Sequence, residues 1–64
     1  MTLTDQELKV VEAMRTYGGS FIQSLAECFI HADEFNKAIL KNAFRRYWNE
    51  YEQTAKQNYG EEQN

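Results

Sequence analysis

The sequence predicts an all-α protein, and three observations lead to this fold class. Apolar residues recur every three or four positions through most of the chain, which is the period of an amphipathic helix. Cap signals and a pair of glycines divide this pattern into helix-sized segments. No stretch has the alternating polar and apolar residues of a strand. The expected arrangement is a helical hairpin followed by a long third helix.

The first helix is expected to begin at Asp5. Thr4 and Glu7 have the spacing of a capping box, in which each side chain accepts a hydrogen bond from the backbone amide of the other residue. Gly18 is expected to end this helix in the left-handed conformation, and Gly19 to let the chain turn. The apolar face of the helix consists of Leu8, Val11, Ala13, Met14 and Tyr17.

The segment from Ser20 to Ala32 is predicted to form the second helix. Ser20 and Gln23 have the spacing of a second capping box. Apolar residues cover more than half of this helix: Phe21, Ile22, Leu25, Ala26, Cys28, Phe29, Ile30 and Ala32. Such a helix has to be covered on two sides, so we expect it to be the central helix, with its neighbours or a second subunit packed over it.

Asp33 is expected to cap the third helix, because its carboxylate suits the positive end of the helix dipole. From there the apolar positions continue at helical spacing, with no proline or glycine before Gly60. The sequence therefore allows one helix over residues 34–57, or two helices that break near Phe44.

The chain is short for a stable domain. A protein of 64 residues buries only about 60% of the surface that its unfolded chain exposes. Self-association is a common source of additional stability, and 42% of the residues are hydrophobic, so we expect a homo-oligomeric helical bundle. We assign residues 1–56 to a single helical domain and residues 57–64, which lack an apolar period, to a frayed or disordered acidic tail.

Charge and composition restrict the cellular location and the classes of partner that we expect. The first residues contain neither a basic leader nor a long apolar run, so we expect no secretory signal and no membrane anchor. A single cysteine cannot form a disulfide within the chain, and a cytoplasmic location is expected. The formal net charge of −3 disfavours the basic surface that is typical of nucleic-acid-binding proteins.

Basic residues are concentrated in the third predicted helix. Lys37, Lys41 and Arg45 follow one another at steps of four, which places them on one helix face, and Arg46 comes next. One interpretation is a solvated face that pairs with acidic residues of a neighbouring helix or subunit. The candidates for such pairs are Glu7, Glu12 and Glu27. The other interpretation is an anion-binding site.

An anion-binding site would combine three features. Helix amides after the glycine pair suit a phosphate, arginines pair with phosphate oxygens, and aromatic rings stack on a base. The candidate ligand-binding residues are Tyr17, Gly18, Gly19, Ser20, Phe21, Lys41, Arg45, Arg46, Tyr47 and Trp48. Aromatic residues at helical spacing are also typical of a core. Because Tyr47 and Trp48 are adjacent, they cannot share one face, so one of them must point to a second helix, a partner or a ligand.

We predict neither an enzyme nor a metal or cofactor site. Cys28 and His31 lie three residues apart and would supply half of a metal site. We interpret them instead as a buried structural thiol and a histidine at a helix C-terminus. With one histidine in the chain, no serine, cysteine or carboxylate has both a base and an orienting partner.

A group of residues carries a resemblance to a known family. These residues are Tyr17-Gly18-Gly19-Ser20-Phe21-Ile22, Leu25, Ala26, Ala32-Asp33, Phe44, Tyr47-Trp48 and Tyr51. With them, the chain from about Leu3 to Glu52 resembles small all-helical proteins encoded by tailed bacteriophages and prophages. Members of this group tend to have a proline after the Asp33 and Phe44 positions, where this chain has Glu34 and Arg45.

The resemblance implies a phage accessory protein, and compact oligomeric phage proteins of this size often counteract host defence. One class sequesters cyclic nucleotides, by which bacteria trigger immunity, between its subunits without cleaving them. We therefore expect a homo-oligomer in the host cytoplasm that binds and sequesters a phosphate-bearing ligand. We expect no membrane partner, and the negative net charge disfavours a DNA partner.

Two other functions stay open. A protein-binding inhibitor or adaptor of a host enzyme would use an acidic surface rather than Arg45 and Arg46. That surface would contain Glu7, Glu12, Glu27 and Glu34. The link from His31 to Asp33 also resembles the connection of a helix-turn-helix DNA-binding regulator. In that case Glu34, Asn36, Lys37 and Lys41 would face the major groove.

Overall fold

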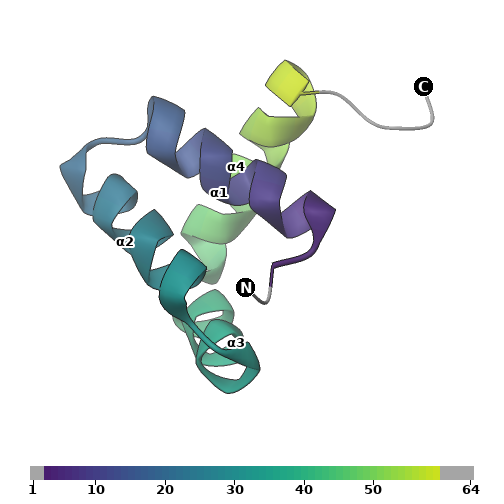
Figure 1. Cartoon of the computed structure of the whole chain (residues 1–64). Coiled ribbons are helices and arrows are strands. Elements are labelled where there is room, and N and C mark those ends of the chain that lie inside the picture. Colours follow the sequence, from purple (N-terminus) through teal and green to yellow (C-terminus); the bar gives the residue numbers. More distant parts are fainter. Residues whose placement is uncertain (1–2, 60–64) are drawn as a thin grey trace.

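The structure, a computed structural model, describes residues 3–59, and helices account for nearly all of them (Figure 1). In chain order they are α1 (Asp5–Tyr17), α2 (Ser20–His31), α3 (Glu34–Ala43) and α4 (Arg45–Tyr59). No strand occurs over this range. The all-α class predicted from the sequence is therefore confirmed for the described residues.

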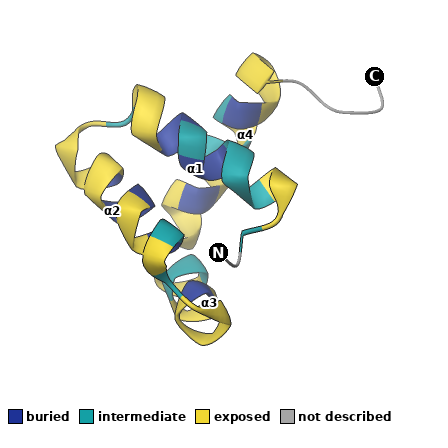
Figure 2. Cartoon of the chain, in the orientation of Figure 1, coloured by how far each residue is buried: buried dark blue, intermediate teal, exposed yellow. Residues whose placement is uncertain are grey.

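α1, and not α2, is the central helix. It packs against both α2 and α4, whereas α3 packs against α4 (Figure 1). Its buried residues are Val10, Val11, Ala13 and Met14 (Figure 2). The expectation of a central second helix is wrong, since α2 buries a single face and leaves Phe21 and Cys28 exposed. An apolar circumference permits burial on two sides, but the positions of the neighbouring helices decide whether it occurs.

The core lies where α1, α2 and α4 meet. Phe29 of α2 and Trp48 of α4 form its aromatic centre, with ring centroids 4.8 Å apart and planes inclined by 44°. Other buried members are Val10, Val11, Met14, Ile22, Leu25 and Ala26. Partly buried apolar residues pack around them, including Leu40 of α3 and Phe44. α3 therefore lies at the edge of the core.

The start of α1 has the capping box that the sequence predicts. The Thr4 amide donates to Glu7 Oε1 over 2.9 Å, and the Glu7 amide donates to Thr4 Oγ1 over 3.1 Å. Two backbone amides at the helix start are thus satisfied by side chains three residues apart.

The turn between α1 and α2 differs from the prediction in two ways. Gly18 has φ −85° and ψ 160°, so it is extended and not left-handed. Its amide closes α1 by donating to the Met14 carbonyl over 3.0 Å. The second capping box does not form, because Gly19 is the N-cap of α2 and no side chain within residues 3–59 caps that helix. The Gln23 side chain donates instead to the Gly18 carbonyl over 3.1 Å.

Asp33 caps α3 as expected, since its Oδ1 accepts a hydrogen bond from the Asn36 amide over 2.8 Å. Replacing Asp33 by Ala leaves this amide without its side-chain partner, so we expect the free energy of unfolding to fall by about 1 kcal/mol. Urea denaturation followed by circular dichroism measures this difference. Asp33→Asn keeps a capping oxygen and is expected to retain most of the stability. Equal loss in both variants would contradict a capping role.

The third predicted helix breaks at Phe44. This is one of the two arrangements that the sequence allows. Phe44 has φ −117° and ψ 36°, and it separates α3 from α4 without a proline. Its amide donates to the Leu40 carbonyl over 2.9 Å, and its carbonyl accepts from the Trp48 amide over 3.0 Å. The hydrogen bonds on both sides are thus kept, while the bend lets Trp48 reach the core.

α4 continues through residues 57–59, which the sequence assigns to a frayed tail. In this last turn the Asn58 side chain donates to the Thr54 carbonyl over 2.9 Å. The remainder of the expected tail, residues 60–64, lies outside the described residues. Within residues 3–59, every helix is too short or too polar to span a lipid bilayer.

Candidate functional site

The structure brings the glycine turn and the start of α4 together. Phe21, in the first turn of α2, lies with its ring centroid 5.8 Å from that of Tyr47 and 6.2 Å from that of Phe44. The rings of Phe44 and Tyr47 are 6.4 Å apart. We call these three residues the aromatic cluster. Phe21 is 55% exposed and Tyr47 is 36% exposed, so part of both rings is open to solvent.

The N-terminus of α2 lies beside this cluster and differs from the starts of α1 and α3. Thr4 caps α1 and Asp33 caps α3, but no side chain in the described part of the chain caps α2. The first amides of a helix attract anions when no capping side chain occupies them. A Cβ at Gly19 would meet no atom within 4 Å, so the space beside this residue is open. A ligand would thus have access to the backbone here.

Three more predicted residues lie on the surface around the turn. Tyr17, at the end of α1, is 53% exposed. Ser20 is exposed and lines a hollow of about 430 Å³. The other residues of this hollow are Arg15, Gln23, Ser24 and Glu27. Gly18 is half-buried and packs close to Ile22. The turn therefore offers polar groups and an exposed ring next to the start of α2.

Arg45 and Arg46 begin α4, within two residues of Tyr47, and both are exposed. The Arg45 guanidinium donates to Asn42 Oδ1 over 2.9 Å. A guanidinium has five N–H donors. This single hydrogen bond therefore leaves Arg45 donors for an anion.

Lys41 and Trp48 do not belong to this surface, which corrects two of the predicted site residues. Trp48 is 7% exposed and packs on Phe29 in the core. Lys41 Nζ donates to Glu7 Oε2 over 2.9 Å and lies 4.9 Å from the centre of the Trp48 ring. Tyr47 and Trp48 point in different directions, because adjacent residues of a helix cannot share one face. The larger side chain, Trp48, is the one buried in the core.

The two lysines of α3 form a cluster of ion pairs with α1. Glu7 Oε1 accepts from Lys37 Nζ over 2.8 Å, and Glu7 Oε2 accepts from Lys41 Nζ. Lys37 Nζ also lies 3.3 Å from the Glu34 carboxylate. We call Glu7, Lys37 and Lys41 the ion-pair cluster. The interpretation that the basic row pairs with Glu7 is confirmed for the two lysines, but Lys37 is 6% exposed, so the part of the row on α3 is not a solvated face.

The pKa of Glu7 reflects this environment. Burial of its carboxylate raises the pKa, but hydrogen bonds from Lys37, Lys41 and the Thr4 amide outweigh burial and lower the pKa from 4.5 to about 2. The hydrogen bond with Glu7 in turn raises the pKa of Lys37. Both partners are therefore charged at neutral pH. This cluster joins α3 to α1. Both ammonium groups pair with Glu7, whereas a contact with a ligand or DNA would require them to face solvent.

The residues considered for metal binding are Cys28 and His31, and both lie on the surface. Cys28 is exposed, which corrects the expectation of a buried thiol. His31 Nε2 lies 3.8 Å from the Glu27 carboxylate, and its side chain is 79% exposed. Among residues 3–59, no three or more histidines, cysteines or carboxylates are grouped so that they could hold a metal ion.

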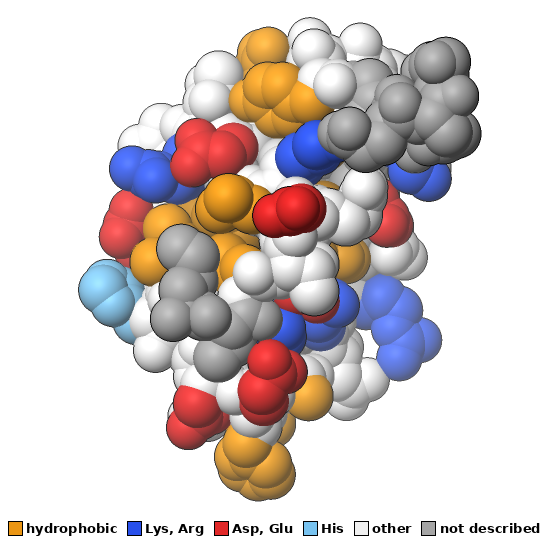
Figure 3. All heavy atoms as spheres, turned by 45° about the vertical axis from the view of Figure 1, so that its right-hand side comes forward, with side chains coloured by type: hydrophobic (Ala, Val, Ile, Leu, Met, Phe, Trp, Pro, Cys, Tyr) orange, Lys and Arg blue, Asp and Glu red, His pale blue; other side chains and the backbone are white. Residues whose placement is uncertain are grey.

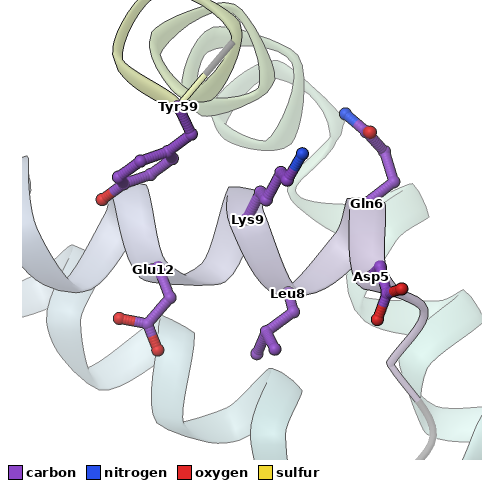
Figure 4. Close-up of a pocket in the computed structure, with 6 residues that line it drawn as sticks. All are labelled: Asp5, Gln6, Leu8, Lys9, Glu12 and Tyr59. Carbon is purple, nitrogen blue, oxygen red and sulfur yellow. The ribbon is translucent and has the colours of Figure 1, made fainter. Parts of the chain in front are cut away.

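A second hollow, of about 510 Å³, lies between α1 and the end of α4 (Figure 4), and nothing in the sequence predicts it. Tyr59 from the last turn of α4 lies over α1 there. The other lining residues come from α1: Asp5, Gln6, Leu8, Lys9 and Glu12. Tyr59 belongs to the segment that the sequence assigned to a frayed tail, so its place beside α1 was not expected.

Comparisons with known proteins give no family for this chain. No model of a known protein family matches it, and neither a curated protein nor a solved structure does. The function has to be inferred from the residues and their geometry.

Proposed function

We propose that this protein binds, without cleaving it, an anionic small molecule that carries an aromatic ring, and that a cyclic nucleotide is the first ligand to test. The site would consist of the exposed rings of the aromatic cluster, the N-terminus of α2 and the arginines at the start of α4. The observation that carries the proposal is the distance of 5.8 Å between the rings of Phe21 and Tyr47. It joins the first turn of α2 to the first turn of α4, and the rest of α2 and all of α3 lie between them in the sequence.

Each part of this surface has a defined role toward such a ligand. A base that stacks on an aromatic side chain gains about 1–3 kcal/mol. The positive end of α2 and its first amides suit a phosphate, because no side chain among residues 3–59 caps them. Arg45 and Arg46 would neutralise the phosphate charge and bind its oxygens in pairs. Binding of this kind needs no general base.

The biological role that we propose is that of a bacteriophage or prophage accessory protein, in which binding removes a nucleotide immune signal of the host. It rests on the resemblance of the turn and of the Phe44 and Tyr47-Trp48 positions to such proteins. The acidic surface of an adaptor has less support, since Glu12 and Glu27 both lie near Arg15, at 3.5 and 3.6 Å. A DNA-binding role would need Lys37 and Lys41, which pair with Glu7.

Native mass spectrometry with a panel of cyclic mononucleotides and dinucleotides tests the proposal. We expect a mass shift of one or more ligands at micromolar concentrations. Replacing Arg45 and Arg46 together by Glu is expected to weaken binding by about tenfold or more, because charged hydrogen bonds to the phosphate are lost. Lys56→Glu is the matched control, since it changes an exposed cation near the other end of α4.

Two results would contradict this function. One is the absence of any mass shift across the panel. The other is a ligand whose affinity is the same for the double arginine variant as for the Lys56→Glu control.

A further inference from the structure

α3 has large apolar side chains on the side that faces away from the core. Phe35 is 74% exposed and Ile39, one turn later, is 49% exposed. Residues four apart share a helix face. The exposed residues Ala38, Asn42 and Ala43 lie beside them on the helix surface. We call these five residues the outer face of α3. Hydrophobic side chains protrude at the end of the molecule where α3 lies (Figure 3).

The opposite side of α3 is where the helix meets the rest of the chain, and its residues there include two lysines. Lys37 is buried and Lys41 is half-buried, and both pair with Glu7 of α1. α3 thus directs charged residues to its own chain, and Phe35 and Ile39 to solvent. This reverses the usual distribution. A helix with this distribution is more stable when another surface covers its outer face.

We propose that a second copy of this chain covers it, with the two α3 helices packed antiparallel about a two-fold axis near Ile39. The distribution of charge along α3 and at the start of α4 favours this partner. Glu34, at the start of α3, lies 3.3 Å from Lys37 Nζ of its own helix, and its side chain is still 72% exposed. Arg45 follows the end of α3 and reaches the outer face through its hydrogen bond to Asn42. Antiparallel pairing places Glu34 of each copy near Arg45 of the other, whereas parallel pairing would bring like charges together.

The side-chain sizes fit the same arrangement. Phe35 precedes Ile39 by as many residues as Ala43 follows it. A two-fold axis near Ile39 therefore sets the ring of Phe35 against the small side chain of Ala43 in the other copy. A helix of 10 residues is about 15 Å long. Its face is smaller than the roughly 800 Å² per partner of a standard interface, so we expect a weak and reversible dimer.

Sedimentation equilibrium from low micromolar to millimolar concentration tests this interface without any ligand. We expect the mass to rise from one chain to two. Phe35→Ser should raise the midpoint concentration by about tenfold or more, because it removes the most exposed ring of the interface. Phe21→Ser is the matched control, since Phe21 is 55% exposed but lies on the aromatic cluster. The outer face is not part of the core, so Phe35→Ser should keep the helical circular dichroism of the native chain.

A charge exchange tests the orientation of the two helices. Arg45→Glu alone should raise the midpoint, and Glu34→Arg combined with Arg45→Glu should restore it. A single chain at millimolar concentration would overturn the inference. So would an unchanged midpoint in Phe35→Ser, or no recovery in the double variant. The inference does not depend on the proposed function, since a dimer that binds no nucleotide would remove that function and leave this interface in place.

Discussion

Replacing Gly18 by Ala is expected to lower the free energy of unfolding by about 2–3 kcal/mol, because the turn between α1 and α2 has no room for a methyl group. A Cβ at this position would lie 2.6 Å from the Cβ of Ile22 and 2.6 Å from the carbonyl oxygen of Met14. Ile22 is buried, and the Met14 carbonyl accepts the hydrogen bond that closes α1. Neither atom can move without disturbing the core or the helix end.

Gly19 provides the control for this substitution. It is adjacent in the chain, its φ of −77° is also open to alanine, and a Cβ there would meet no atom within 4 Å. We expect Gly19→Ala to change the stability by less than about 0.5 kcal/mol. Urea denaturation of the two variants and the native chain measures both effects. Similar stability of the two variants would contradict the steric role of Gly18.

Replacing Glu7 by Gln is expected to lower the free energy of unfolding at pH 7 by about 2–3 kcal/mol. Glutamine is similar in size but carries no charge, so Lys37 would lose its closest carboxylate while its position stays buried. The Glu7 side chain is only 15% exposed, and solvent therefore screens the ion pairs weakly. Thermal and urea unfolding, followed by circular dichroism, measure the loss.

The pH dependence gives a second test of the same residue. The pKa of Glu7 is about 2 in the folded protein, below its ordinary value of 4.5. A lowered carboxylate pKa stabilises the folded state above the ordinary value, and this contribution is lost as the pH falls toward the folded pKa. We therefore expect the native chain to lose stability between about pH 5 and pH 2.

Glu7→Gln should have a flatter profile over this range, since it has no carboxylate at position 7 to titrate. Glu12→Gln is the control, because Glu12 pairs with Arg15 over 3.5 Å at the surface and both side chains are 47% exposed. An exposed pair contributes about 0–1 kcal/mol. If Glu12→Gln lost as much stability as Glu7→Gln, the ion-pair cluster would not stabilise the folded chain more than an exposed ion pair does.

Features that depend on neighbouring residues were predictable from the sequence. Thr4 with Glu7 and Asp33 with Asn36 are hydrogen-bonded over three residues, so their caps follow from spacing alone. The breaks between α1, α2 and α3 follow from the same signals. The second capping box failed because Ser20 is the first residue of α2 rather than its cap, and the two assignments differ by one position.

The candidate site was predictable in part. Phe21 and Tyr47 were both selected by residue type, and the structure places their rings together. Phe44 was absent from the predicted site residues because it had the spacing of a core position. Lys41 and Trp48 were included wrongly, since residue type does not show which side of a helix meets the core. The bend at Phe44 sets that direction for Trp48.

By itself the sequence determined the helical class, the starts of α1 and α2 to within a residue and the cap at Asp33, because hydrogen bonds within one or two turns fix these features. The tertiary structure decided that α1 is central, that Lys37 is buried against Glu7 and that Phe35 faces solvent. These outcomes depend on how whole helices pack, and the free energy of that packing comes from contacts between residues far apart in the chain.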